Sequence, residues 1–309
     1  MEEKQEKVVI IGSGPAGLTA AIYTARGNLS PLVVAGRTPG GQPMLTTDVD
    51  DYPGFPQGVQ GPELMGYFRS QAERFGARFL SEDAVTVDFS KYPFEIETEN
   101  SKVLTEAVIV ASGASPMWLG LPSEQRLIGR GVSVCATCDG PFFKDKEIII
   151  VGGGDTAMRE AQHLSKYAKL VTIVHRRETF RAQDALQELV KSKPNIKFLF
   201  NSVVEEVLGD EKVTGVKLKN TVSGEVSEMS IDGIFIAIGY KPNTDIFQGK
   251  LELDERGYIV LKDETRSSVE GVFVAGDAAD YRYRQVIVAG GSGAKAALDV
   301  EEYLDKIKN

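Results

Sequence analysis

Two cysteines lie three residues apart and are the only cysteines of the 309-residue chain. Cys135 and Cys138 enclose Ala-Thr, and Asp139 follows them. A C-x-x-C pair of this kind is typical of a redox dithiol. Half of a zinc site and an inert buried pair are the alternatives. Zinc needs two further ligands, and the only histidines, His163 and His175, are badly spaced for that. We therefore expect a redox-active disulfide and no metal site.

The carboxyl group of Asp139 needs a physical interpretation of its own. An ionised carboxylate beside Cys138 would raise the pKa of the thiol and slow formation of the thiolate. The carboxyl group helps only if it holds a proton that it can give to a leaving thiolate. We treat Asp139, with Cys135 and Cys138, as a candidate catalytic residue. An ordinary turn residue before Gly140 is the alternative.

Two glycine-rich turns, 140 residues apart at positions 12 and 152, each follow a short apolar run and open a helix. Glycine permits the tight turn and lets the backbone approach a pyrophosphate, which then faces the helix N-terminus. In this context the turns predict two dinucleotide-binding domains, and a purely structural turn is the alternative. The candidate binding residues are Gly12, Ser13, Gly14, Pro15 and Ala16 in the first turn and Gly153, Gly154, Asp155 and Thr156 in the second.

The residues after the next strand differ between the two units. An acid that binds a ribose would stand there in an NAD site. The first unit has Ala-Gly-Arg at 35–37, so its ribose must be held in another way. The second has His175, Arg176 and Arg177, and guanidinium groups suit a 2′-phosphate. Two arginines could favour NADPH over NADH by roughly 10²–10⁴-fold. Exposed surface charges are the alternative, and His175 either stacks or caps the strand.

The composition limits the classes of protein to which the chain can belong. Hydrophobic residues make up 42% and charged residues 26%, values typical of a globular chain. The net charge of −9 argues against nucleic-acid binding. No apolar run approaches the ~18 residues of a membrane helix, and the charged N-terminus lacks the apolar core of a signal peptide. We expect a cytoplasmic protein with no membrane partner.

The other patterns predict an α/β fold. Apolar residues at helical spacing predict a helix over 62–75, ended by Gly76. Alternation at 94–97 and 216–219 predicts half-exposed antiparallel strands. The apolar runs at 107–113 and 271–277 predict buried strands that end in tight turns.

Order and spacing of these motifs resemble the low-molecular-weight, bacterial-type thioredoxin reductases over nearly the whole chain. The matching residues are those at 12–17, 40–42, 52–54, 135–140, 152–157, 175–177, Arg181, 237–239, 276–277 and 284–285. Four residues depart from the family pattern: Asp51 replaces a common Asn, Pro43-Met44 follows Gly-Gly-Gln, and Arg159 stands where an acid is common. None of these departures removes a group to which we assign a catalytic role.

The resemblance implies two Rossmann-like domains in a homodimer, the second inserted into the first. Residues 1–115 and 245–309 would bind FAD, and residues 116–244 would bind NADPH and carry the dithiol. A rotation of the inserted domain, with hinges near 114–118 and 242–246, would let both donors reach the flavin in turn. Residues carried over from the family are Gly41, Gln42, Asp277, Arg284, Gln285 and Val286 beside the flavin and Arg181 beside NADPH.

The implied reaction is thioredoxin-disulfide reduction. A hydride passes from NADPH to FAD, reduced FAD reduces the Cys135–Cys138 disulfide, and the dithiol reduces the disulfide of thioredoxin or a thioredoxin-like protein. We expect Cys138 to face the flavin and Cys135 to attack the partner. The alternatives are the same core with another acceptor, a ferredoxin-dependent enzyme, a redox sensor without rapid turnover, and a structural module.

Overall fold

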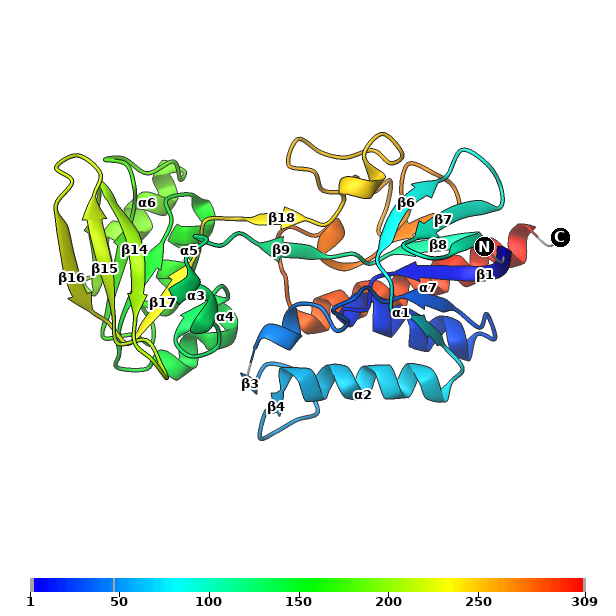
Figure 1. The fold of residues 1–309 in the computed structure, drawn as a ribbon, viewed down its shortest axis with the longest axis horizontal. Coiled ribbons are helices and arrows are strands. Elements are labelled where there is room, and N and C mark those ends of the chain that lie inside the picture. Colours follow the sequence, from blue (N-terminus) through cyan, green and yellow to red (C-terminus); the bar gives the residue numbers. More distant parts are fainter. Residues whose placement is uncertain (1–2, 47, 308–309) are drawn as a thin grey trace. The chain divides into compact units, whose positions relative to one another are not determined.

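The computed structural model describes residues 3–46 and 48–307, and the chain forms two compact units (Figure 1). The first comprises residues 1–115 and 241–309, and the second residues 116–240. The chain passes between them along β9 (Ala114–Pro116) and β18 (Tyr240–Pro242), which pair with each other. The expected boundary after residue 244 lies four residues later than the observed one. Residues 241–244 belong to the first unit because Asn243 and Thr244 donate hydrogen bonds to carbonyl groups of that unit.

A sheet of seven described strands forms the centre of the first unit. Its path runs β5-β2-β1-β8-β7-β6, with β19 parallel to β8. The strands β5, β2, β1 and β8 are parallel, whereas β6 and β7 are antiparallel to their neighbours. The bounds are β1 (Glu3–Ile11), β2 (Leu32–Val34), β5 (Arg78–Leu80), β6 (Ala84–Asp88), β7 (Phe94–Thr98), β8 (Lys102–Val110) and β19 (Val272–Val274).

The described residues of the first unit form three α-helices, and small residues let two of them approach closely. Helices α1 (Pro15–Arg26) and α7 (Val286–Ile307) pack against each other, and α2 (Gly61–Arg74) also contacts α1. A Cβ added at Gly293 of α7 would lie 2.1 Å from the carbonyl oxygen of Ala16. The short elements of this unit are η1 (Gln42–Leu45), β3 (Asp48–Val49), β4 (Val59–Gln60), η3 (Asp245–Phe247) and η4 (Gly276–Ala278).

The second unit has a five-stranded parallel sheet in the order β10-β17-β11-β12-β13 and a three-stranded antiparallel sheet in the order β14-β15-β16. Its strands are β10 (Val132–Ser133), β11 (Glu147–Val151), β12 (Leu170–Val174), β13 (Ile196–Leu199), β14 (Ser202–Leu208), β15 (Gly215–Asn220), β16 (Val226–Ser230) and β17 (Gly233–Ile236). Its helices are α3 (Pro122–Arg126), α4 (Ala136–Asp139), η2 (Gly140–Phe143), α5 (Asp155–Leu164) and α6 (Asp184–Lys191).

The elements agree with the sequence patterns, and the α/β prediction is confirmed. The helix expected over 62–75 is α2, and the alternating segments lie in β7 and β15. Strand β8 is longer than expected because its first half, from Lys102, alternates between buried and partly exposed residues before the fully buried run. Among the described residues, none of the helices combines the length and apolarity of a membrane span.

Two glycines of α7 provide a matched test of helix packing. Substitution Gly293→Ala places a methyl group against the α1 backbone and should destabilise the protein by about 1–3 kcal/mol. Substitution Gly291→Ala is the control, because nothing lies within 4 Å of an added Cβ there, and alanine should stabilise the helix by up to ~1 kcal/mol. Thermal unfolding midpoints should therefore move in opposite directions. Equal shifts at the two positions would contradict the packing argument.

Candidate active site: a disulfide and two glycine-rich turns

Cys135 and Cys138 form a disulfide at the start of α4, with their Cα atoms 5.3 Å apart. Cys135 caps the helix, because its Sγ accepts a hydrogen bond from the Cys138 backbone N–H at 3.2 Å. The Thr137 hydroxyl lies 3.3 Å from the same sulfur, and Ser133 Oγ accepts the Cys135 N–H at 3.1 Å. The donors therefore converge on Cys135 Sγ, which favours negative charge on that sulfur when the disulfide is open.

The end of α4 lies against α5. Asp139 is the last residue of α4, is partly buried, and donates its backbone N–H to the Cys135 carbonyl at 3.1 Å. A Cβ added at Gly140 would lie 3.4–3.5 Å from the side chains of Leu164, Tyr167 and His163, which is ordinary van der Waals contact. The helix that carries the disulfide thus packs against the helix that follows the second glycine-rich turn.

The first glycine-rich turn joins β1 to α1 and leaves no room for a side chain at Gly12. Gly12 has φ +114°, and a Cβ there would lie 2.2 Å from the Ala111 carbonyl oxygen. Ser13 Oγ donates to the Ala35 carbonyl at 2.7 Å and accepts the N–H of Gly40 at 3.2 Å. The α1 N-terminus has no side-chain cap, so its amides are available to an anion.

Two further segments reach this turn. A Cβ added at Gly41 would lie 2.9 Å from the Gly14 Cα, and one at Gly276 would lie 2.9 Å from the Ala16 Cβ. Gln42 begins η1 directly after Gly41, and Asp277 lies in η4 directly after Gly276. The structure therefore gathers the turn at 12–16, the loop at 41–42 and η4 in one place, although they lie far apart in the sequence.

Asp277 is a buried carboxyl group with an altered pKa. Burial raises its pKa to about 6, the charge of Arg284 opposes this rise, and Asp280 adds to it. Arg284 has φ +49° and is followed by Gln285 and by Val286, the first residue of α7. The expected residues at 277 and 284 are thus coupled by charge within the first unit.

The second glycine-rich turn joins β11 to α5 and repeats the same constraint. A Cβ at Gly152 would lie 2.4 Å from the Ala237 carbonyl oxygen, and one at Gly153 would lie 2.2 Å from His175 Cε1. Gly154 has no atom within 4 Å of an added Cβ and begins α5 without a side-chain cap. Thr156 follows in the first turn of α5 and is partly exposed. An open space therefore lies at the N-terminus of this helix.

Hydrogen bonds tie the arginine loop after β12 to the second turn. The Gly153 carbonyl accepts the N–H of Arg181 at 2.8 Å and the N–H of Ala182 at 3.2 Å. Asp155 Oδ1 accepts the N–H of Gln183 at 2.9 Å. These contacts hold the backbone of the loop against the turn. The side chains of Arg176, Arg177 and Arg181 are exposed.

His175 lies beneath the second turn rather than on the surface. Its side chain is buried, and its ring centre is 5.5 Å from that of Phe180. Burial lowers the pKa of His175, and the charges of the neighbouring arginines lower it further. The imidazole is therefore neutral near pH 7 and packs against the Gly153 backbone.

Sequence reasoning missed several contacts around these residues. Ser133 and Thr137 lie close to Cys135 in the sequence, and their hydroxyl groups were a signal that could have been used. The contact between Asp155 and Gln183 spans 28 residues and has no local pattern that would reveal it.

Comparison with known proteins places these sites in a family. Residues 6–293 match the model of the pyridine nucleotide-disulphide oxidoreductases. The chain is 53% identical over 303 residues to a thioredoxin reductase of Streptomyces coelicolor, covering 96% of this chain and 93% of the relative. It is 49% identical over 305 residues to one of Rickettsia felis, with 97% and 98% covered.

Two solved structures are similar over almost the whole chain. Thioredoxin reductase from Streptococcus pyogenes superposes with a TM-score of 0.94 at 38% identity, covering 99% of this chain and 100% of that one. The enzyme from Giardia duodenalis gives 0.93 at 42% identity, covering 98% and 99%. The fold class and the resemblance drawn from the sequence are confirmed, and with them an oxidoreductase that uses flavin and nicotinamide cofactors. The chain belongs to the thioredoxin reductases within the pyridine nucleotide-disulphide oxidoreductase family.

Proposed function

We propose that this protein is an NADPH-dependent thioredoxin-disulfide reductase with FAD in its first unit and NADPH in its second. The observation that carries the proposal is the Cys135–Cys138 disulfide in a chain with two glycine-rich turns, each leading into a helix that has no side-chain cap. When bound, the two cofactors would supply an electron pair that reduces this disulfide. A dithiol that can pass its electrons to another disulfide is the chemistry that a thioredoxin substrate requires.

The first unit fits a dinucleotide with a flavin. The turn at 12–16 and the loop at 41–42 approach each other with no side chain between Gly41 and Gly14, and the N-terminus of α1 has no side-chain cap, so its amides can receive a pyrophosphate. In the proposal Asp277 contacts the ribityl chain, and Arg284, Gln285 and Val286 border the flavin ring. The buried carboxyl of Asp277 is a suitable partner for sugar hydroxyls, because hydrogen bonds would replace the water that burial removes.

The second unit fits a pyridine nucleotide that carries a 2′-phosphate. Gly153, Gly154 and Thr156 would receive the pyrophosphate at the N-terminus of α5. The exposed side chains at 176, 177 and 181 would receive the 2′-phosphate. Asp155 then acts by holding the arginine loop against the turn through the Gln183 N–H.

The contacts around the disulfide support different roles for the two sulfurs. Opening the disulfide takes up two electrons, and the hydrogen bonds to Cys135 Sγ favour its thiolate. This thiolate would attack one sulfur of the thioredoxin disulfide and release a partner thiolate. Cys138 would then attack Cys135, re-form the internal disulfide and release the second partner thiolate. Asp139 is proposed to supply protons to the leaving thiolates.

The remaining parts of the proposal concern assembly and location. We infer a homodimer from the family resemblance. We also infer a cytoplasmic location, because a dithiol that NADPH keeps reduced belongs in a reducing compartment.

The arginine loop predicts a preference between nucleotides. Replacing Arg176 and Arg177 together by alanine should raise the KM for NADPH by roughly 10²–10⁴-fold and leave the KM for NADH nearly unchanged. Arg126→Ala removes an exposed guanidinium elsewhere in the same unit and serves as the control. Steady-state kinetics with both nucleotides measure the effect. An equal loss for NADH and NADPH would contradict the assignment.

Asp277 predicts a pH dependence of stability in the flavin-free protein. Between pH 3.8 and about 6 the folded protein binds more protons than the unfolded chain, so stability falls as pH rises through this window. Asp277→Asn should therefore be more stable than wild type above pH 6, by up to about 3 kcal/mol, from a shift of about 2.2 pH units. The difference should vanish near pH 4 in urea unfolding. A difference that stays constant from pH 4 to 8 would refute the assigned cause.

In the proposed path, reduction of the flavin by NADPH and reduction of thioredoxin by the dithiol are separate steps, and a variant of Cys135 can distinguish them. Cys135→Ser should abolish thioredoxin reduction, whereas NADPH should still bleach the flavin band in an anaerobic titration. The variant should consume one equivalent of NADPH less than wild type, because its disulfide is missing. A variant that keeps thioredoxin turnover would exclude the proposed path, and a flavin band that does not respond to NADPH in wild type would exclude NADPH as the donor.

A further inference from the structure

We propose that Arg256 and Tyr281 are positioning residues of the FAD site: their contact, here called the Arg256–Tyr281 clasp, holds the segment between Asp277 and Arg284 in place. This inference rests on the proposed function, because it assigns that segment to the flavin. All residues involved belong to the first unit.

One half of the clasp is a hairpin built around Asp254. The Asp254 N–H donates to the Tyr258 carbonyl at 2.8 Å, and the Gly257 N–H donates to the Asp254 carbonyl at 2.9 Å. Asp254 Oδ1 accepts the N–H groups of Arg256 at 2.8 Å and Tyr258 at 2.9 Å. Burial raises the pKa of Asp254, but these hydrogen bonds and Arg256 outweigh it and lower the pKa overall. The carboxylate therefore stays ionised and orders the hairpin.

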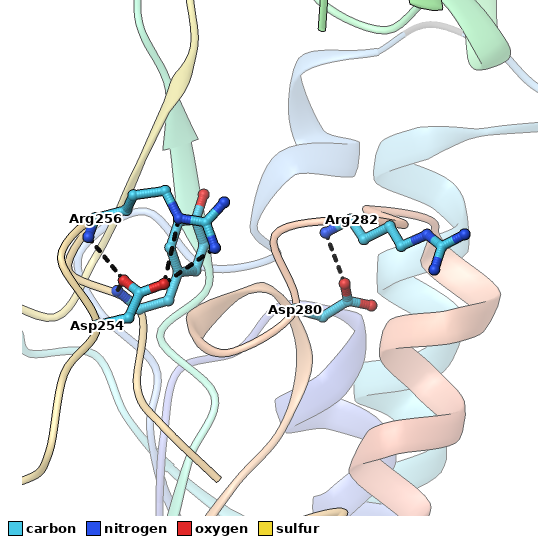
Figure 2. Close-up of polar contacts among 5 residues, drawn as sticks. Asp254, Arg256, Asp280 and Arg282 are labelled. Carbon is cyan, nitrogen blue, oxygen red and sulfur yellow. Dashed lines mark hydrogen bonds and ion pairs between the residues drawn. The ribbon is translucent and has the colours of Figure 1, made fainter. Parts of the chain in front are cut away.

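The Arg256 side chain connects this hairpin to Tyr281. Its Nε and Nη2 atoms lie 3.3 and 3.1 Å from Asp254 Oδ2 (Figure 2). Its guanidinium carbon lies 3.7 Å from the centre of the Tyr281 ring, and Tyr258 meets that ring edge-on at 5.8 Å. Hydrogen bonding to Tyr281, followed by that to Asp254, raises the pKa of Arg256. The cation is thus held by a carboxylate and placed over an aromatic face.

The other half is the segment that the clasp would hold. Asp280 Oδ1 accepts the N–H group of Arg282 at 2.7 Å (Figure 2). It also accepts the N–H group of Tyr283 at 3.2 Å. The next residue, Arg284, has φ +49°, a conformation that a residue with a side chain adopts only when its surroundings impose it. The hydrogen bonds to Asp280 and the contact of Tyr281 with Arg256 both order the residues that lead into this conformation.

The position of Tyr281 gives the clasp its effect on the FAD site. Tyr281 follows Asp277 by four residues and precedes Arg284 by three. Its side chain is 47% exposed, and that of Arg256 is 54% exposed. The pair therefore adds little to the core, and its contribution lies in ordering the segment before FAD binds. An exposed cation–π contact of this kind corresponds to roughly 2–5-fold in a dissociation constant.

The experiment measures FAD dissociation from the purified holoenzyme by the fluorescence of released flavin. Arg256→Met and Tyr281→Leu should each raise the dissociation constant about 2–5-fold. Arg256→Lys and Tyr281→Phe should restore most of the affinity, because they keep the cation and the ring. The double variant with methionine and leucine should bind no more weakly than the weaker single variant, since both changes remove one contact.

Arg282→Met is the matched control. Arg282 lies in the same segment, and its guanidinium lies over the neighbouring Tyr283 ring at 5.1 Å. It should keep the wild-type dissociation constant, because that contact does not connect the segment to the hairpin. Equal weakening by Arg282→Met and Arg256→Met would overturn the clasp, and so would an unchanged dissociation constant in Arg256→Met.

Two further readouts separate this inference from others. The KM for NADPH should be unchanged in every variant, because the clasp lies in the other unit. Arg256→Lys and Arg256→Met should differ, because only the first keeps the cation. If both variants lost the same amount of thermal stability and of bound FAD, the role of Arg256 would be merely structural and the clasp would be overturned. A wild-type protein that carries no FAD would instead overturn the proposed function itself.

Discussion

Close approach of backbone to backbone at glycine is the constraint on which the rest of each unit depends. In the first unit, a side chain at Gly12 or Gly17 would collide with carbonyl oxygens at 2.2 and 2.0 Å, and one at Gly293 with the α1 backbone. In the second unit, Gly152 has the same role against the Ala237 carbonyl, whereas Gly153 leaves room for the ring of His175. Because glycine keeps strand, turn and helix close together, the amides at the helix N-terminus are accessible to a ligand backbone or phosphate.

The helix N-termini proposed to bind the cofactors are distinct from the helix that carries the disulfide. The N-termini of α1 and α5 have no side-chain caps, so each unit has helix amides to which an anion can bind. The disulfide at Cys135 lies on another helix, with its own hydrogen-bond donors. The amides proposed to bind phosphate and the sulfurs of the disulfide are therefore on different helices.

Electrostatics differ between the two units in a way that fits their proposed ligands. The first unit buries a carboxyl group, Asp277, whose pKa near 6 reflects a cost that sugar hydroxyls could relieve. The second unit exposes Arg176, Arg177 and Arg181 beside a buried, neutral His175. Its positive charges stay in water until a phosphate arrives, so they cost the free protein little. The Arg256–Tyr281 clasp orders the first of these two sites from outside.

Several features were predictable from the amino-acid sequence alone: the C-x-x-C pair, both glycine-rich turns, the arginines that follow the strand after the second turn, and the α/β class. These features depend on residue type and short spacing, which local periodicity reveals. Only the tertiary structure placed His175 beneath Gly153, joined Asp155 to Gln183, brought Gly276 to Ala16, and assigned residues 241–244 to the first unit. Such contacts join segments that are distant in the chain. They are decided by how whole elements pack, and no local pattern carries that information.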